Sequence, residues 1–167
     1  MKGRIRSLDM EYRIREMNED EYPLLNDFLY EAIYIPEGAE RPPKSIINAP
    51  ELQEYIKDFG KSKHDKALTA EIKGKIAGAV WVRIMNDYGH IDDETPSLAM
   101  SVHKEYRGMG IGTELLKELL SILKSSGYRK VSLSVQKANY AVNMYKKAGF
   151  RVIDENEEEY IMAAYLS

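Results

Sequence analysis

The six-residue run RGMGIG (107–112) places a glycine at every second position, between the apolar segment SLAMSVH (97–103) and a leucine-rich stretch that continues to Lys124. Inside a helix, each glycine costs about 1 kcal/mol relative to alanine. A strand that leads through a glycine-rich turn into a helix is a general anion site, because the first-turn N–H groups are unpaired and the helix dipole adds positive charge there. The run therefore predicts a strand, a phosphate-binding turn and a helix, in that order.

The spacing of the glycines separates this run from two other phosphate-binding loops. It lacks the G-x-x-x-x-G-K-[ST] spacing of a P-loop. It also lacks G-x-G-x-x-G, and no acidic residue follows a second strand at the distance that a dinucleotide-binding fold requires. A nucleotide-binding protein that uses the glycine loop in another way stays open as an alternative.

The chain has 167 residues, a formal net charge of −3 and no cysteine. We expect one domain that spans 1–167. The net charge gives no attraction for nucleic acid, and the lack of cysteine excludes disulfides, thiolate metal sites and cysteine nucleophiles. No apolar run approaches the ~20 residues of a membrane span, and no signal-peptide pattern opens the chain. We therefore expect a cytoplasmic protein with no metal and with no nucleic-acid or membrane partner.

Hydrophobic periodicity predicts helices that alternate with strands, which is typical of an α/β or α+β layer fold. In the first helix, Asn18 and Glu21 have capping-box spacing whereas Pro23 fits a first helical position, so two starts stay open. The segments 35–48 and 86–96 are predicted to be irregular or polar connections. The predicted strands are 10–17, two strands within 67–85 around the turn at 73–75, 97–103, 130–136 and a closing hairpin at 150–166. The predicted helices are 18–34, 49–60, a long helix from the glycine run to Lys124 with Ile111, Leu115, Leu116, Leu119, Leu120 and Leu123 on its buried face, and 138–149.

Two motifs resemble those of the GNAT superfamily of N-acetyltransferases. Residues 107–112 match the R/Q-x-x-G-x-G/A signature of the pyrophosphate loop, although a proline that usually follows the strand valine is His103 here. The segment NYAVNMYKKAGF (139–150), 27 residues beyond Gly112, resembles N-x-x-A-x-x-x-Y-x-x-x-G-F. Its matching residues are Asn139, Ala141 (one position early), Tyr145, Gly149 and Phe150. The order of the predicted elements also fits the family along nearly the whole chain.

This resemblance implies a mixed, mostly antiparallel twisted sheet with splayed central parallel strands and helices on both faces. Acetyl-CoA would lie between the strands 97–103 and 130–136. The backbone of the first strand would pair with the pantetheine arm, the N–H groups of the glycine loop would hold the pyrophosphate, and a strand N–H would face the thioester oxygen. The residues implied to bind acetyl-CoA are Met100, Val102, Arg107, Gly108, Met109, Gly110, Ile111, Gly112, Thr113, Asn139 and Tyr145.

The resemblance also implies that Tyr145 is the general acid that protonates the departing CoA thiolate. With ordinary pKa values, near 8.5 for a thiol and 10 for a phenol, this transfer is close to balanced. The residue shares a helix face with Ala138, Ala141, Val142 and Ala148, so its side chain is expected to point inward. Apart from the motif, the same spacing would fit a structural core tyrosine.

A base is expected because an alkyl ammonium with a pKa near 10.4 costs roughly 4–5 kcal/mol to deprotonate at pH 7. Glu94 is our preferred candidate, since it is closest to the strand 97–103. An acidic turn of this kind can equally be a solvated connection. The other candidates are His90, Asp92, Asp93 and Glu71, and the candidate acceptor contacts between the first two helices are Tyr34, Ile35 and Arg41.

The function that follows is transfer of the acetyl group of acetyl-CoA directly to a primary amine, with a small cationic or amino-acid-like acceptor. A homodimer is possible as a family-level expectation. Two alternatives stay open, namely a transferase for another acyl-CoA such as succinyl-CoA, and a non-catalytic acyl-CoA-binding sensor. The presence of Tyr145 beside Asn139 argues against the sensor.

Overall fold

The computed structural model describes residues 3–5, 11–85 and 90–166. Within them, one sheet of eight strands has the order β1-β2-β3-β4-β5-β6-β8-β7. The strands are β1 (Gly3–Ile5), β2 (Glu11–Glu16), β3 (Lys66–Ile72), β4 (Lys75–Arg83), β5 (Ser97–Val102), β6 (Lys130–Gln136), β7 (Arg151–Glu155) and β8 (Glu159–Tyr165). The helices are α1 (Leu25–Ala32), α2 (Pro50–Gln53), α3 (Ile111–Ser125) and α4 (Ala141–Lys147), with short 3-10 helices at Glu19–Leu24, Lys44–Asn48 and Lys104–Tyr106.

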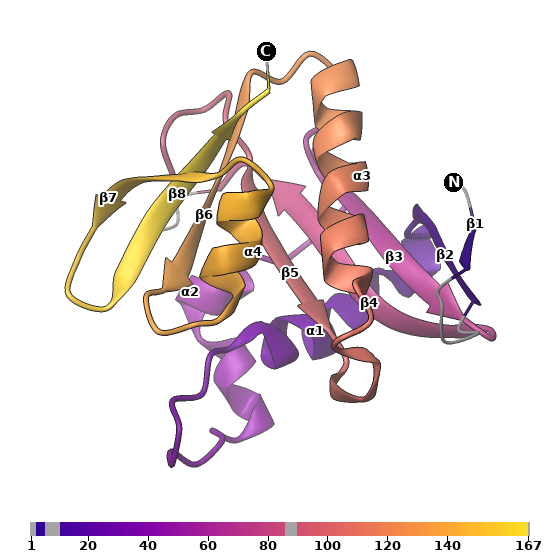
Figure 1. The fold of residues 1–167 in the computed structure, drawn as a ribbon, viewed down its shortest axis with the longest axis horizontal. Coiled ribbons are helices and arrows are strands. Elements are labelled where there is room, and N and C mark those ends of the chain that lie inside the picture. The colour runs from indigo at the N-terminus through magenta and orange to yellow at the C-terminus, as the bar shows by residue number, and fades with distance from the viewer. Residues whose placement is uncertain (1–2, 6–10, 86–89, 167) are drawn as a thin grey trace.

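Helices cover both faces of this sheet (Figure 1). On one face, the apolar stripe of α3 and the inner side of α4 pack against the central strands. On the other face, α1 and the segment around α2 cover Trp81, which is 1% exposed. Because alternate residues of a strand point to opposite faces, the central strands contribute side chains to both cores. The result is the mixed α/β architecture that the sequence predicts.

The sheet is antiparallel except where β5 meets β6. These two parallel strands pair at Ser97 and Ser132, near their N-terminal ends. Beyond that point they diverge, as Figure 1 shows. The facing edges of their C-terminal halves therefore do not form a ladder with each other, and a strand-like ligand can approach the backbone there.

Most of the predicted elements are confirmed within a few residues. The hairpin between β3 and β4 turns at Lys73 and Gly74, whose φ values of 49° and 80° are those of a two-residue hairpin turn with positive φ at both positions. The helix that follows the glycine run is α3, and its predicted apolar stripe is buried except that Leu120 is partly exposed. The short strand β1 pairs with β2 and was not predicted.

The first predicted helix, 18–34, forms in two parts. Its beginning is a 3-10 helix in which the Asn18 N–H donates to Glu21 Oε1 at 2.8 Å, half of a capping box. The regular helix α1 begins only at Leu25, two residues after Pro23. The start at Asn18 is therefore used, as a 3-10 helix, whereas Pro23 lies inside that 3-10 helix and not at the first position of α1.

The prediction of a helix over 49–60 is wrong beyond Gln53. Regular α2 covers Pro50–Gln53, and the chain continues in turns to Gly60. Side chains of β4 donate to carbonyls of this irregular stretch. Trp81 Nε1 donates to Tyr55 O at 3.1 Å, and Arg83 donates to the carbonyls of Glu54 and Lys57 at 3.3 and 2.8 Å.

Helix α1 is fastened to β5 by a buried hydrogen bond, in which Ser101 Oγ donates to Phe28 O at 2.6 Å. We expect Ser101→Ala to lower the free energy of unfolding by about 1 kcal/mol, because this carbonyl loses a partner that water cannot replace. Urea unfolding measures the change. An unchanged free energy would mean that the bond contributes nothing to the docking of α1.

Candidate active site

The glycine run forms the turn between β5 and α3 and leaves the N-terminus of α3 open. Gly108 and Gly110 have φ values of 83° and 81°, in the left-handed region that favours glycine. Gly110 is the N-cap residue, and in the described part of the chain no side chain caps the helix. The first-turn N–H groups and the positive end of the helix dipole are therefore available to an anion.

Gly112 differs from the other two glycines of the run because its φ is not positive. A Cβ atom at this position would lie 3.6 Å from Met144 Sδ and 3.8 Å from Met100 Cε and Val102 Cγ2, which are ordinary contact distances. Neither backbone conformation nor protein packing therefore requires a glycine here. The residue lines a cleft, so the requirement that remains is close approach of a ligand to the backbone.

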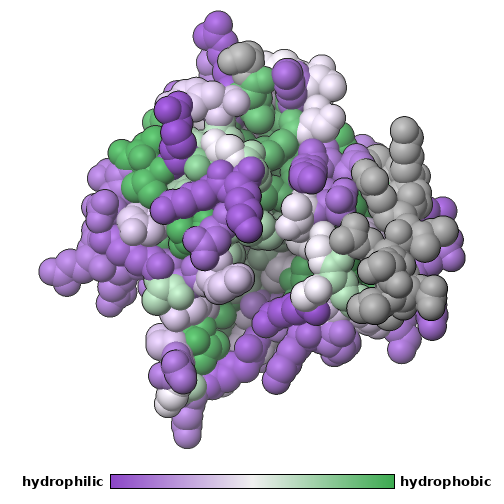
Figure 2. Space-filling view, viewed as in Figure 1, coloured by the Kyte–Doolittle hydropathy of each residue, from purple (hydrophilic) through white to green (hydrophobic). Residues whose placement is uncertain are grey.

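A cleft of about 910 Å³ opens where β5 and β6 diverge. Figure 2 shows the surface hollowed near the middle of the viewed face, between polar side chains. The cleft brings together ten of the eleven residues predicted to bind acetyl-CoA. They are Met100, Val102, Arg107, Gly108, Gly110, Ile111, Gly112, Thr113, Asn139 and Tyr145, whereas Met109 is not among the lining residues and packs against the core under α3.

Tyr145 reaches the cleft from α4 and is only 7% exposed. Its ring packs edge-on against Phe150, with centroids 5.7 Å apart. Burial raises the pKa of the Tyr145 hydroxyl to about 12, so the phenol keeps its proton at neutral pH. No hydrogen bond holds this hydroxyl among the residues that the structure describes, which leaves it free to donate to a ligand.

Asn139 begins the segment that carries Tyr145. Its Oδ1 accepts a hydrogen bond from the Ala141 N–H at 2.9 Å, and this bond fixes the first turn of α4. Because Oδ1 is used in this way, the side-chain NH₂ is the part of Asn139 that can donate into the cleft.

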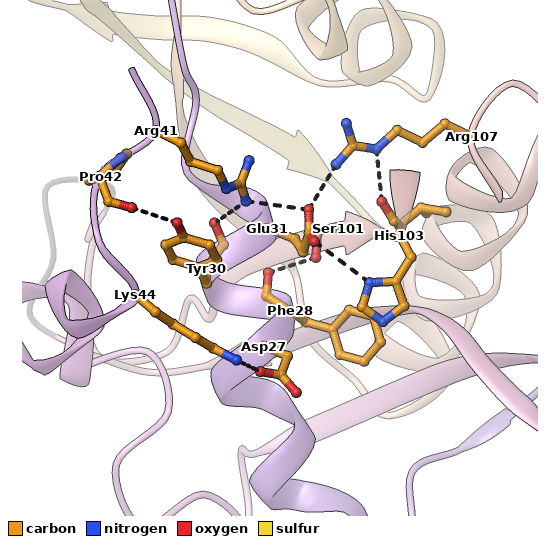
Figure 3. A network of polar contacts seen from close by, with 11 residues as sticks. Asp27, Phe28, Tyr30, Glu31, Arg41, Pro42, Lys44, Ser101, His103 and Arg107 are labelled. Carbon is orange, nitrogen blue, oxygen red and sulfur yellow. Dashed lines mark hydrogen bonds and ion pairs between the residues drawn. The ribbon is translucent and has the colours of Figure 1, made fainter. Parts of the chain in front are cut away.

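Glu31 lies at the centre of a polar network that joins α1 to the glycine loop (Figure 3). Its carboxylate is 3.4 Å from Arg41 Nη2, 3.4 Å from Arg107 Nη2 and 3.9 Å from His103 Nδ1. The Arg107 Nε atom donates to Val102 O, the end of β5, at 2.8 Å. The side chain of Arg107 therefore links the end of β5 to α1, and its own backbone N–H donates to Lys104 O at 3.3 Å.

The segment between α1 and α2 also contributes to the cleft, with Tyr34, Ile35 and Arg41 among the lining residues. This wall is anchored where Tyr30 Oη donates to Pro42 O at 2.5 Å and the Arg41 guanidinium lies 4.4 Å from the centre of the Tyr30 ring. The predicted acceptor contacts and ten of the predicted acetyl-CoA contacts thus line a single cleft.

The preferred candidate base, Glu94, is exposed and does not line the cleft. It lies three residues before Ser97, where β5 and β6 are still paired. The neighbouring Asp92 accepts hydrogen bonds from the Thr95 hydroxyl and the Glu94 N–H, both at 2.8 Å, and these bonds lower the pKa of Asp92. This placement does not support Glu94 as the base and favours the structural interpretation of the acidic turn.

The remaining candidate bases are also outside the cleft lining. Asp93 is exposed and lies 3.6 Å from His90 Nε2. Glu71 accepts a hydrogen bond from Arg15 Nε at 2.9 Å and so belongs to an ion pair between β2 and β3. The acidic residues that do line the cleft are Glu31 and Glu159 within the described ranges, and neither was predicted. Glu159 lines the cleft because of the register in which β8 pairs with β6, and no local sequence pattern predicts that register.

A model of the acetyltransferase (GNAT) family matches residues 14–150. The chain therefore belongs to this family of acetyltransferases. The expectation drawn from the glycine run and the 139–150 segment is confirmed at the level of the family and of its acetyltransferase chemistry.

Curated relatives include two archaeal proteins named N-alpha-acetyltransferase. The protein from Sulfolobus acidocaldarius is 30% identical over 129 residues, which cover 68% of this chain and 74% of the relative. The protein from Sulfurisphaera tokodaii is 31% identical over 113 residues, which cover 58% of this chain and 67% of the relative.

Solved structures with the same fold cover nearly the whole chain. The GNAT domain of S. lividans PAT is 17% identical, with a TM-score of 0.71 over 99% of this chain and 96% of that one. PaiA N-acetyltransferase from Thermoplasma acidophilum, solved in complex with coenzyme A, is 23% identical, with a TM-score of 0.68 over 93% of this chain and 99% of that one. Among the helices that are described here, none has the length and apolar character needed to cross a membrane.

Proposed function

We propose that this acetyltransferase moves the acetyl group of acetyl-CoA directly to a primary amine, and that the acceptor is a small cationic or amino-acid-like molecule. The observation that carries the proposal is the cleft in which an open, glycine-lined helix N-terminus and a buried tyrosine meet between two diverging strands. The relative solved with coenzyme A supports the choice of cosubstrate.

In this proposal, the chain holds acetyl-CoA mainly through its backbone. The first-turn N–H groups of α3 and of the turn before it bind the pyrophosphate, and the absence of a side chain at Gly112 lets the phosphate come close. The unpaired edge of β5 around Met100 and Val102 pairs with the pantetheine arm. The Asn139 NH₂ is free to donate to the same arm.

Tyr145 protonates the sulfur that leaves. Its raised pKa keeps the proton in place, but it also makes the phenol a weaker acid than an ordinary tyrosine. Against a thiol of ordinary pKa near 8.5 the transfer would be uphill by on the order of 5 kcal/mol, so the balance expected from ordinary values does not hold. Burial beside Tyr145 would raise the pKa of the thiol as well, which would bring the pKa values of the phenol and the thiol closer together.

The proposed acceptor class rests on charge. A net charge of −3 and the carboxylate of Glu159 in the cleft favour a cationic amine, whereas the other cleft carboxylate, Glu31, is already paired with Arg41 and Arg107. A second candidate is the N-terminal amino group of a protein, which the two archaeal relatives named N-alpha-acetyltransferase support. Both acceptors present a primary amine to the same cleft, so the chemistry is shared and the shape of the acceptor differs.

A thiol-release assay with acetyl-CoA and a panel of amines tests the proposal. The panel holds spermidine, free amino acids and short peptides with a free N-terminus. We expect release with at least one small amine and a lower KM for it than for the peptides. Preference for the peptides would move the assignment to the N-terminal acceptor, and turnover with succinyl-CoA in place of acetyl-CoA would change the donor.

A sensor without catalysis gives a different result in the same experiment. Such a protein would bind coenzyme A, as measured by calorimetry, and would release no thiol with any amine. Protection against melting by ATP but not by coenzyme A would instead support a nucleotide-binding protein.

A further inference from the structure

Glu159 is the first residue of β8, and its backbone is fixed from two sides. It pairs with Gln136 of β6 in antiparallel register, and its N–H donates to Asn156 Oδ1 at 2.7 Å in the turn after β7. Residues directly opposite in an antiparallel pair lie on the same face of the sheet. The alternate residues of β8 that pack toward α3 and α4 are Tyr160, Met162 and Ala164. Glu159 and Gln136 therefore lie on the other face, which α1 covers further along the sheet.

The carboxylate of Glu159 has no counter-charge in the described part of the chain. Its hydrogen-bond partner is Gln136 Nε2 at 3.5 Å, at the outer limit for such a bond. The other cleft carboxylate, Glu31, is already engaged by Arg41 and Arg107. A half-buried carboxylate without a cation has lost hydration without a compensating partner, so an incoming ammonium gains from binding there.

We propose that Glu159 binds the ammonium group of the acceptor and takes a proton from it before the amine attacks the thioester, an inference that rests on the proposed function. The nitrogen forms a bond to the acetyl carbon, and the carbon–sulfur bond breaks. Of the three ammonium protons, one goes to Glu159, one ends on the sulfur by way of Tyr145, and one stays on the amide nitrogen. The carboxylic acid then returns its proton to solvent.

The surroundings of Glu159 suit this role. Burial raises the pKa of Glu159, and the neighbouring Glu158 adds to the shift, so the carboxylate is a stronger base than an exposed glutamate. Tyr145 comes from α4, which packs on the opposite face of the sheet. The group that receives the amine and the group that protonates sulfur thus approach the divergence of β5 and β6 from opposite sides.

Glu159→Gln tests the proposal, with Glu158→Gln as the matched control. Glu158 is the adjacent residue of the same turn and is exposed, so the control removes the same charge outside the cleft. With spermidine, or the most active amine of the panel, we expect Glu159→Gln to raise the amine KM about tenfold while the KM for acetyl-CoA stays within twofold. The control should change neither value by more than twofold. Glu159→Asp, which keeps the charge but withdraws it by one methylene, should give an intermediate amine KM and covers the case in which the glutamine variant does not fold.

The pH profile separates proton transfer from simple attraction. The ionisable groups around Glu159 include Glu158 and Tyr160 on its own hairpin, and Lys137 of the segment after β6, which pairs with Glu155 of β7. Because the raised pKa must be exceeded before the carboxylate can accept a proton, kcat/KM for the amine should show an acid limb in the wild type that follows the ionisation of Glu159. In Glu159→Gln this limb should be lost, and kcat/KM should instead rise with pH up to the pKa of the amine itself, because only the neutral amine can then attack. An amine KM and acid limb unchanged in Glu159→Gln would overturn the role of Glu159 and leave the proposed function standing. A wild-type protein that turns over no amine would overturn both.

Discussion

Replacement of Tyr145 by phenylalanine is expected to lower kcat about a hundredfold, in the range that a general acid contributes, while the KM for acetyl-CoA changes little. The phenol is 7% exposed and packs on Phe150, so the loss of one oxygen leaves no cavity that would collapse the cleft. Because burial raises its pKa to about 12, Tyr145 stays protonated up to strongly alkaline pH. The wild-type kcat should therefore show no alkaline fall from this group below about pH 11.

Tyr165→Phe is the matched control, because Tyr165 is 57% exposed at the end of β8 and lies outside the cleft lining. Steady-state kinetics and calorimetric titration with coenzyme A measure the effect on both variants. Equal kcat values for Tyr145→Phe and the wild type would remove Tyr145 from the mechanism. A loss of coenzyme A binding in Tyr145→Phe would make it a binding residue rather than an acid.

The parts of the site that the sequence predicts are those in which a local pattern has a local cause. The glycines at positions 108 and 110 indicate a turn, and both have positive φ. The leucine stripe that follows indicates which side of α3 is buried. The spacing of Tyr145 within its helix likewise reports that the side chain points inward, which the structure confirms. In each case the residues that carry the signal and the structure that they specify lie within a few positions of one another.

The parts that the sequence does not predict depend on contacts between distant segments. The stretch after the early end of α2 is held by Trp81 and Arg83, which donate to its carbonyls from β4, and no local pattern indicates these contacts. Glu31 becomes the centre of a network because Arg41, His103 and Arg107, all distant in sequence, lie around its carboxylate. Glu159 reaches the cleft through its pairing with Gln136, and a shift of one residue in that register would turn it to the opposite face. The prediction of Glu94 as the base depends on a distant contact in the same way. The position of the acidic turn relative to the cleft is set by where β5 and β6 pair, and the local sequence does not indicate that point.

Gly112→Ala is expected to raise the KM for acetyl-CoA about thirtyfold and to leave the fold intact or slightly more stable. The φ of Gly112 is not positive, and a Cβ atom would meet its nearest protein atom at 3.6 Å, so the variant is not strained. Alanine is also the better helix former by up to about 1 kcal/mol. The added methyl group projects into the cleft beside the open N-terminus of α3, and it would keep a phosphate from one or two charge-assisted hydrogen bonds, each worth roughly 1.5–3 kcal/mol.

Two comparisons make this test specific. Ser121→Ala places an alanine on the exposed side of the same helix, so it shares the gain in helix propensity and should leave the KM for acetyl-CoA unchanged. Gly110→Val is less informative, because Gly110 has a φ of 81° and any side chain there is strained whether or not a ligand binds. Thermal melting and the KM values for acetyl-CoA and the amine, measured on Gly112→Ala and Ser121→Ala together, separate stability from binding. If Gly112→Ala binds acetyl-CoA as tightly as the wild type, the pyrophosphate does not lie against Gly112, and the glycine run loses the reason that we assign to its third glycine.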